Sequence, residues 1–357
     1  MSRVSIKDIA RAADVSHSTV SRALSDSPLV NAETKARIQQ LAQEMGYSPD
    51  AQARSLVMGR TYTIGLVVTT ITDPFFGQVV EAIENTALDH GYSVILATSR
   101  SEPDREIAAV EMMHSKRVDG VIVASSRVGA LYQDHLEQLG VPIVLLNSHS
   151  MQSGPYTFSI SVDDRHGACQ ATEHLARLGH RRIAYVTGPA DHSNNIERLA
   201  GYQQALAEAG IDPDPSLIVG GTGRTGGGER ALPRLMALDE PPSAVFCYND
   251  MTAIGLMRGA RRAGLSIPGE LAVVGFDDIP FASFVNPSLT TIAQPKAEMG
   301  RQAMQMVLAL VPDQDPKDSV VSNITLRGRL IVRESSGPRQ VPTPEYVSKQ
   351  VEMKEAV

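Results

Sequence analysis

The chain has 357 residues, enough for two or three domains with cores of their own, and its 42% hydrophobic and 20% charged residues exclude wholesale disorder. Two cysteines exclude a disulfide framework. The start of the chain has no signal-peptide pattern and no apolar run approaches the roughly 18 residues of a membrane helix, so the sequence predicts a cytoplasmic protein with no membrane contact.

Charge is distributed unevenly. The formal net charge is −7, but residues 1–60 hold eight Lys and Arg against six Asp and Glu, so this stretch carries +2 and the remainder −9. A basic head on an acidic body is typical of a small nucleic-acid-binding module joined to a second domain, although chance asymmetry gives the same numbers.

Three helical patterns occupy the first 48 residues. Apolar residues recur at helical spacing over 5–13, where Ser5 and Asp8 form a pair typical of helix starts. A short break precedes a second pattern over 16–24, and a third amphipathic helix is predicted from Ala32 to Met45. Two helices joined by a tight turn, the second with a polar outer face, form the helix-turn-helix pattern.

The polar face of the second helix has the chemistry needed to read DNA. Arg22 can donate two parallel hydrogen bonds to a guanine, and His17 and Ser18 can reach base edges from the helix start. Hydroxyl and amide side chains that can hold phosphates or cap the helices complete the candidate set: Ser5, Ser16, Thr19, Ser21, Asn31 and Thr34. The alternative is a small structural bundle with a solvated polar face.

The order of these residues resembles the head of the LacI/GalR family of bacterial transcription regulators. The resemblance runs from Val4 to Leu24, including Ala10 and Thr19-Val20-Ser21-Arg22, and continues at intervals to Pro49. It implies a homodimer that binds an inverted repeat in double-stranded DNA and is controlled by a small effector. It also implies an α/β fold in which the head and a hinge helix precede a two-lobed, periplasmic-binding-protein-like core of doubly wound parallel sheets.

A short helix is predicted over 49–60, between Asp50 as its N-cap and Gly59 as its stop. Such a short helix is marginal alone in water and needs a partner to form. Leu56 matches the family position that enters the minor groove and kinks the duplex, while Arg54 suits a phosphate contact. Without the resemblance, packing of Leu56 against the body is the simpler interpretation.

From residue 61 to 340, apolar runs alternate with helical patterns, which predicts parallel sheets. The expected strands are 63–69, 93–98, 120–124, 142–147, 157–163, 182–187, 217–220, 244–249, 271–276, 289–292, 321–326 and 329–333. Helices are expected near 75–89, 104–116, 129–139 and 295–310. The resemblance implies three crossings between lobes, near 148–160, 280–292 and 315–325, with lobes of about 61–150 plus 290–315 and 160–285 plus 320–335, and a tail over 341–357.

Polar and aromatic residues follow several predicted strands, where an open parallel sheet binds ligands. The candidate effector-binding residues are Phe75, Phe76, Asn147, His192, Asn194, Arg198, Asn249, Asp277 and Gln294. For the two phenylalanines, core packing is the alternative, and for Arg198 it is a surface ion pair. Asp250 and Asp278 are expected to cap helices or brace the fold.

The segment Gly220–Gly228 departs from many sugar-binding relatives, because it has no aromatic residue to stack on a sugar. This favours a smaller, acidic or acyclic ligand. Its Gly221-x-Gly223-x-x-Gly226 pattern also fits a dinucleotide fingerprint, but Pro233 is expected to interrupt the next helix, so we predict no nucleotide cofactor.

Nothing in the sequence favours catalysis. Neither a Gly-x-Ser-x-Gly elbow nor a His-Glu-x-x-His motif occurs, no histidines pair at metal spacing, and Cys169 and Cys247 are expected to be buried hydrophobes. We therefore predict neither an enzyme nor a metal protein.

The sequence predicts a ligand-responsive transcriptional regulator. The favoured interpretation is a repressor of a carbohydrate or related catabolic operon, controlled by a small polar effector such as a sugar or sugar acid. The alternatives are a cytoplasmic small-molecule-binding protein and a corepressor-dependent regulator of a non-sugar pathway. By resemblance, the homodimer contacts are the helix faces near 75–89 and 104–116 and Phe281–Val285.

Overall fold

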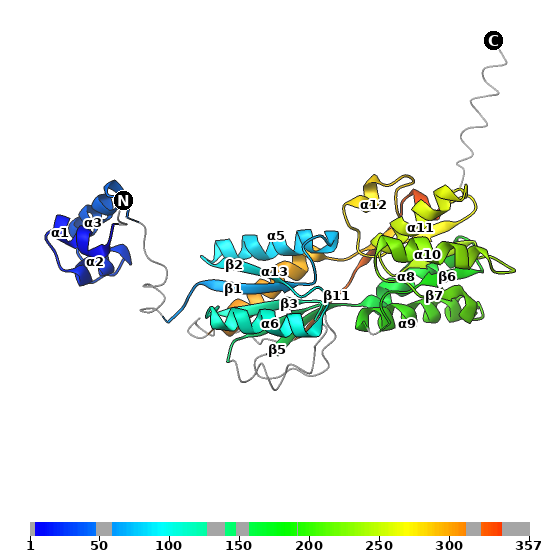
Figure 1. Cartoon of the computed structure of the whole chain (residues 1–357), viewed down its shortest axis with the longest axis horizontal. Helices are drawn as coiled ribbons and strands as arrows, with labels where there is room; N and C mark the ends of the chain where they lie inside the picture. Colours follow the sequence, from blue (N-terminus) through cyan, green and yellow to red (C-terminus); the bar gives the residue numbers. More distant parts are fainter. Residues whose placement is uncertain are drawn as a thin grey trace, which may run out of the picture. The chain divides into compact units, whose positions relative to one another are not determined.

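The computed structural model describes residues 4–47, 59–126, 140–147, 157–190, 192–311 and 323–337 (Figure 1). It divides into two compact units, Met1–Tyr62 and Thr63–Val357. The hinge helix expected from residue 49, with Arg54 and Leu56, the helix expected over 129–139 and the tail over 341–357 fall outside the described residues.

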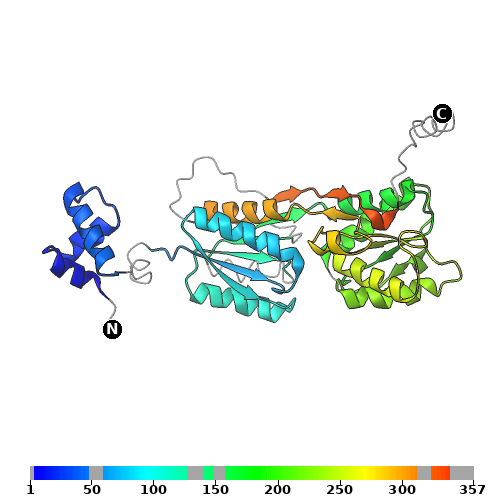
Figure 2. The same cartoon turned by 90° about the horizontal axis from the view of Figure 1, so that it is seen from above.

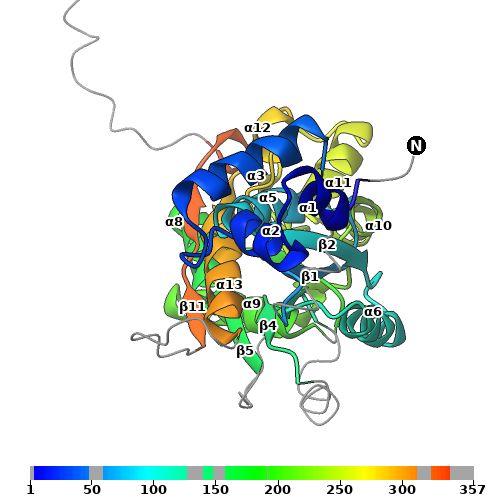
Figure 3. The same cartoon turned by 90° about the vertical axis from the view of Figure 1, so that its left-hand side faces the viewer.

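The first unit is built from α1 (Ile6–Ala12), α2 (His17–Leu24) and α3 (Ala32–Glu44) (Figure 3). The three helices share one apolar core, in which Ile9, Val20 and Ile38 are fully buried. All three helices begin and end within two residues of the expected bounds, because the apolar spacing that predicted them is also what packs them together.

Side-chain caps set the helix starts in this unit. The Asp8 carboxylate accepts hydrogen bonds from both the backbone N–H and the hydroxyl of Ser5. The Ser16 hydroxyl accepts from the Thr19 N–H at 3.1 Å, so Ser16 is the N-cap of α2, as expected. Asn31 caps α3 in the same way through the Thr34 N–H. Each cap satisfies a backbone donor that would otherwise have no partner within its helix.

The first lobe of the second unit is a parallel sheet with strand order β11-β5-β4-β3-β1-β2. Its strands are β1 (Thr63–Val68), β2 (Ser93–Thr98), β3 (Gly120–Ala124), β4 (Ile143–Leu146), β5 (Thr157–Val162) and β11 (Ile324–Leu326). Helices α5 (Pro74–Asp89) and α13 (Lys296–Leu310) cover one face and α6 (Pro103–Ser115) the other (Figure 2). Gly300 lets α13 approach α5 closely, because a Cβ there would lie 2.4 Å from the Val79 carbonyl oxygen.

The second lobe is a parallel sheet with strand order β7-β6-β8-β9. Its strands are β6 (Ile183–Val186), β7 (Ile218–Val219), β8 (Ala244–Cys247) and β9 (Ala272–Val274), and its helices are α8 (Asp164–Arg177), α9 (Ser193–Glu208), α10 (Thr225–Met236), α11 (Asp250–Arg262) and α12 (Phe281–Phe284). Alternate strand residues face the two helical layers: Tyr185 and Phe246 pack under α8 and α9, while Val186 and Val245 pack under α10 and α11.

The chain crosses between the lobes where β5 leads into α8, where β10 (Thr291–Ala293) leads into α13, and where β11 leads into β12 (Arg329–Ile331). Strands β10 and β12 pair as an antiparallel two-stranded ribbon. Short 3-10 turns at Pro215–Leu217 and Glu334–Ser336 complete the unit.

The structure corrects three expectations about the core. Strands β5 and β11 pair with each other and with β4, so they extend the first lobe rather than the second, and the crossings fall later in the chain. Pro233 lies inside α10, which continues to Met236 because Leu232 and Leu235 are buried in the lobe core. Cys169 is only half-buried, whereas Cys247 is buried as expected.

Candidate functional site: an exposed polar helix face and a polar pocket between two lobes

The outer face of α2 carries the side chains expected to read DNA. His17, Ser18, Ser21 and Arg22 are exposed, while Val20 and Ala23 point into the core. The Arg22 guanidinium has no hydrogen bond or ion pair to any residue that the structure describes, which leaves all its donors available. The structure thus places a free cation and small polar groups on one exposed face.

Several of the other predicted DNA contacts also serve the fold. Ser16 and Asn31 use their side-chain oxygens as caps, and the Ser5 hydroxyl donates to the Asp8 carboxylate. The Ser16 hydroxyl also hydrogen-bonds the hydroxyls of Ser18 and Thr19. Thr34 is half-buried and gives its N–H to Asn31. These residues fix the helix starts, where backbone N–H groups suit phosphates.

A pocket of about 660 Å³ lies between the two lobes of the second unit. Its walls are the segments that follow β1, β2, β3 and β4 in the first lobe and β6, β7, β8 and β9 in the second. It lies at the carboxyl ends of both parallel sheets, as expected for ligand binding in open α/β folds. All nine predicted effector residues line this pocket, so the structure brings the whole set together.

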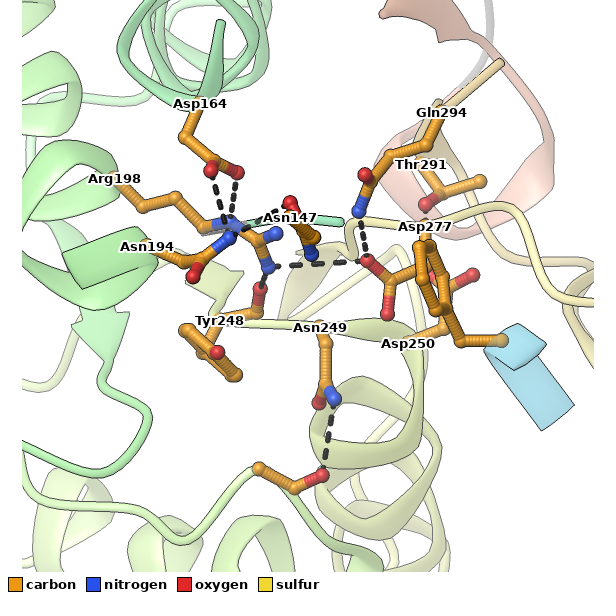
Figure 4. Close-up of polar contacts among 12 residues, drawn as sticks. Asn147, Asp164, Asn194, Arg198, Tyr248, Asn249, Asp250, Asp277, Thr291 and Gln294 are labelled. Atoms are coloured by element: carbon orange, nitrogen blue, oxygen red, sulfur yellow. Dashed lines mark hydrogen bonds and ion pairs between the residues drawn. The ribbon is translucent and has the colours of Figure 1, made fainter. Parts of the chain in front are cut away.

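At the second-lobe side of the pocket, Arg198 makes a buried ion pair with Asp164. The Arg198 side chain is 3% exposed and that of Asp164 0%, and Nε lies 2.7 Å from Oδ1. Asn194 Nδ2 donates to the other Asp164 carboxylate oxygen at 2.9 Å and to the side-chain oxygen Oδ1 of Asn147 at 3.0 Å (Figure 4). Asn147 follows β4 of the first lobe, so this network joins the lobes.

Burial acts to lower the pKa of Arg198, but the negative charges of Asp164 and Asp277 outweigh burial and hold the pKa above its ordinary value. The guanidinium carbon lies 3.7 Å from the centre of the Phe276 ring and 4.7 Å from that of Tyr248. Arg198 is therefore a permanent cation fixed by a carboxylate and two aromatic faces. The surface ion pair that was the alternative interpretation of Arg198 does not form, since its ion pair with Asp164 is buried.

Asp277 and Gln294 form the opposite side of the network. Asp277 Oδ1 accepts from Gln294 Nε2 at 2.6 Å and lies 3.8 Å from Arg198 Nη1. Burial, only partly offset by Arg198, raises the pKa of Asp277 to about 7. Gln294 Oε1 is buried with no hydrogen-bond partner within the described structure, so a bound donor would satisfy it.

Other acidic residues brace this site, as expected. Asp250 is fully buried and accepts from the Ile279 N–H and the Thr291 hydroxyl, and burial raises its pKa well above the ordinary value. Asp278 pairs with Arg333 at 2.7 Å. The N-cap of α11 is Asn249 rather than Asp250, and its amide nitrogen also donates to the Gly223 carbonyl.

The remaining walls differ in chemistry. Phe75 and Phe76 are buried at the start of α5 and meet edge to face at 5.2 Å, so they supply an apolar wall. His192, and the exposed Arg100 and Arg224, bring polar and positive groups to the lining. Asn147 and Asp277 have positive φ, a strained backbone that is common at ligand sites.

Sequence reasoning missed Asp164, Tyr248, Arg100 and Arg224. Asp164 lies 34 residues before Arg198, and only the packing of α8 against α9 brings them together. Arg100 and Arg224 follow the strands predicted over 93–98 and 217–220, so their position was a signal that could have found them, whereas Tyr248 lay inside the strand predicted over 244–249. In the described part of the chain, no three His, Cys, Asp or Glu residues could hold a metal ion, and no helix there is long and apolar enough to span a membrane.

Comparison with known proteins gives a family match for each of the two units. The family model for bacterial regulatory proteins of the lacI family matches residues 5–50, and a periplasmic binding protein-like domain matches 172–336. The HTH-type transcriptional repressor CytR of Escherichia coli K12 is 36% identical over 303 residues, which cover 85% of this chain and 88% of that protein.

Solved structures of transcriptional regulators are also similar to this chain. A lac repressor dimer bound to operator and the anti-inducer ONPF has a TM-score of 0.84 and 27% identity, and it covers 94% of this chain and 100% of that one. A complex of the transcriptional regulator CelR with cellobiose has a TM-score of 0.70 and 29% identity, over 93% of this chain and 100% of that chain.

Proposed function

This chain belongs to the lacI family of bacterial regulatory proteins, and we propose that it is a transcriptional repressor of a carbohydrate or related catabolic operon, released from its operator by a small polar effector. It is a DNA-binding regulator, and the relatives named above are regulators and not enzymes. Binding to operator DNA supports a cytoplasmic location.

The pocket between the lobes is the observation that carries the effector proposal. A hydrogen-bonded chain runs from Asn147 of the first lobe through Asn194 to Asp164 and Arg198 of the second. A ligand that bonds this chain contacts both lobes at once. It favours one lobe arrangement only by its difference in affinity between the two arrangements.

The ligand class follows from the lining. The pocket offers fixed donors at Arg198, acceptors at Asp277 and Gln294, and an apolar wall at Phe75 and Phe76. A sugar or sugar acid matches this mixture, since it carries many hydroxyl groups on a small carbon frame. Polar groups that converge on one apolar pocket are typical of small-molecule sites.

The proposed DNA contacts are the exposed face of α2 with Arg22, His17 and Ser18, together with Leu56 as a wedge in the minor groove. Two heads on a symmetric dimer fit an inverted repeat. The lac repressor structure is a dimer on its operator, which supports the same arrangement here. Phe281 and Phe284 are 51% and 80% exposed, so they are proposed dimer contacts, together with the expected faces of α5 and α6.

The test is a selection of bound duplexes from a randomised DNA library, followed by release of the selected duplex with fractionated metabolites. We expect an inverted repeat to be enriched and a sugar-containing fraction to release it. R22A should lose the specific duplex but keep weak, salt-sensitive binding. Leu56→Ala should weaken the specific duplex more than random DNA.

Two outcomes contradict the proposal. Enrichment of a single half-site would argue against a dimer on an inverted repeat. Enrichment only after metabolites are added would identify a corepressor-dependent regulator, the alternative that the sequence left open. Analytical ultracentrifugation of the chain, with F284D as the variant expected to weaken the dimer, tests the contact face separately.

A further inference from the structure

Lys296 is a buried cation at a position that its own helix does not explain. It is the first residue of α13 and is only 4% exposed. The N-terminus of a helix carries a partial positive charge, so a cation there is repelled by the helix. Burial disfavours the charge further and lowers the pKa of Lys296. The reason for an ammonium at this position therefore lies outside α13, in the groups that it contacts.

The ammonium bonds the main chain of two pocket-side residues, Asp277 and Asp278. Lys296 Nζ donates to both of their backbone carbonyl oxygens, to that of Asp278 at 2.9 Å. The two residues have φ values of +114° and +52°, which residues other than glycine rarely adopt. In this conformation two successive carbonyl oxygens meet one donor group. A compact ammonium with three donors is suited to bond both.

Residues 292–296 hold Asp277 by its side chain and by its main chain. Gln294 Nε2 donates to Asp277 Oδ1 at 2.6 Å, as Figure 4 shows. Lys296, two residues later, holds the carbonyl oxygen of Asp277, and the Asp277 N–H donates to the Ile292 carbonyl oxygen at 2.8 Å. Because all three bonds come from one short stretch, the direction of the Asp277 carboxylate depends on where that stretch lies.

The Lys296 bonds also join the two lobes. The Asp277–Asp278 segment follows β9 of the second lobe, whereas Lys296 begins α13, which covers the sheet of the first lobe and packs against α5 at Gly300. A movement of α13 relative to the second lobe therefore either carries this segment with it or breaks both Nζ bonds. Among the described residues, the pocket lining includes Asp277 and Gln294 but not Lys296.

Charges of both signs surround this contact. Burial raises the pKa of Asp277 to about 7, and the positive charges of Arg198 and Lys296 oppose that rise. Lys296 thus acts on the ionisation of Asp277 as well as on its main chain. The other titratable groups whose charges act on Asp277 or Lys296 come from neighbouring elements: Asp73 before α5, Tyr248 after β8, Asp250 of α11 and Asp278.

We propose that Lys296 is a positioning residue for the effector site. It holds the Asp277–Asp278 segment of the second lobe against the start of α13 in the first lobe, and so fixes the direction of the Asp277 carboxylate towards Gln294 and Arg198. The proposal rests on the proposed function, because Asp277 is a proposed effector contact. An effector that displaces Asp277 is then coupled to α13 through Lys296, although it does not touch Lys296.

The experiment titrates Asp277 in the full-length protein without any ligand. Aspartate labelled with 13C at Cγ gives an NMR signal for each carboxyl group, and D277N identifies the signal of Asp277. K296M removes the ammonium but keeps an unbranched side chain, so it should raise the pKa of Asp277 from about 7 to roughly 8 or above. K296R keeps a cation with several donors and should restore most of the parent value.

Arg333 provides the matched control, because it is a second, largely buried cation beside the same segment. Its guanidinium pairs with Asp278 Oδ1 at 2.7 Å and donates to the Leu289 carbonyl oxygen at 2.8 Å. R333M should lower the melting temperature but raise the pKa of Asp277 less than K296M does. Hydrogen exchange of the Asp277 amide should also become faster in K296M than in R333M.

A reciprocal measurement does not need K296M to fold. The charge of Asp277 supports the protonated form of Lys296, so D277N should lower the pKa of Lys296 further. The 15N signals of the lysine ammonium groups report this pKa, and K296R identifies the signal of Lys296.

Three results would overturn the proposal. They are an unchanged pKa of Asp277 in K296M, equal effects of K296M and R333M on Asp277, and an unchanged pKa of Lys296 in D277N. None of these results removes the proposed function, which fails only if no inverted repeat is selected or no metabolite fraction changes DNA binding.

Discussion

The buried pair of Arg198 and Asp164 yields a prediction whose size follows from the structure. R198M removes the cation but leaves the Asp164 carboxylate, which is 0% exposed and still accepts from Asn194, without its positively charged partner. Breaking one side of a buried ion pair costs about 3–5 kcal/mol, since the remaining charge has lost both water and its partner. We therefore expect R198M and D164N each to lose this much unfolding free energy.

The assay is thermal and urea unfolding of the full chain, followed by near-ultraviolet circular dichroism. Tryptophan is absent, so the signal comes from tyrosines such as Tyr185 and Tyr202, which are buried in the second lobe. For a domain of this size, about 3–5 kcal/mol lowers the melting temperature by about 6–20 °C. The double variant R198M/D164N should recover part of the loss, because neither member of the pair is then left as a charge without the other.

A surface pair serves as the matched control. Arg301 pairs with Glu298 on α13, but their side chains are 45% and 37% exposed. Water and salt screen such a pair, so R301M should change the melting temperature little. If R198M and D164N unfold like R301M, the pair is not buried in solution. If the double variant loses the sum of the single losses, the two residues are not coupled.

Three further predictions concern other parts of the chain. G255A should lower the free energy of unfolding by about 1–3 kcal/mol, because its Cβ would lie 1.9 Å from the Thr225 carbonyl oxygen. G77A, whose Cβ would have no atom within 4 Å, should raise it by about 0.5–1 kcal/mol. Melting curves that shift in the same direction for both variants would contradict the α10–α11 contact. Burial raises the pKa of Asp277 from 3.8 to about 7, so between these values the folded protein keeps a proton that the unfolded chain loses. The free energy of unfolding should therefore fall as the pH rises from about 4 to about 7. In urea unfolding, D277N should lack that part of the fall, and a pH profile identical to that of the parent protein would refute the shift. S16A should destabilise α2 by about 1 kcal/mol, because it removes the N-cap hydrogen bond. Hydrogen exchange of the α2 amides should become faster while that of the α3 amides changes less. Unchanged exchange in α2 would argue against the cap.

Most of the architecture could be predicted because its signals are local. Helical spacing around Ile9 and Val20 gave the first unit, and apolar runs such as Val121–Ala124 gave buried parallel strands. The effector residues could be grouped because parallel strands end at one edge of a sheet, so residues such as Asn147 and Asn249 meet in space.

What could not be predicted depends on contacts between distant segments. Asp164 follows Asp163, and nothing in the neighbouring sequence identifies which of the two contacts Arg198. Only the packing of α8 on α9 brings Asp164 to Arg198. The pairing of β11 with β5 joins segments more than 160 residues apart, so local patterns place neither in a lobe. Tyr248 was missed because it follows an apolar strand, where an aromatic side chain is expected to pack in the core.

Strand β1 connects the pocket wall to the opposite end of the first lobe, so a rotation of the lobe about the pocket moves that end furthest. Its carboxyl end leads to the pocket wall at Thr69 and Asp73, and its first residue, Thr63, is where the second unit begins. Six residues at about 3.3 Å each separate these two ends by roughly 20 Å. A rotation of roughly 10° centred on the pocket would move the far end by about 3–4 Å, more than the length of a hydrogen bond. A molecule the size of one sugar could thus displace Thr63, the first residue of this lobe, by more than the length of a hydrogen bond.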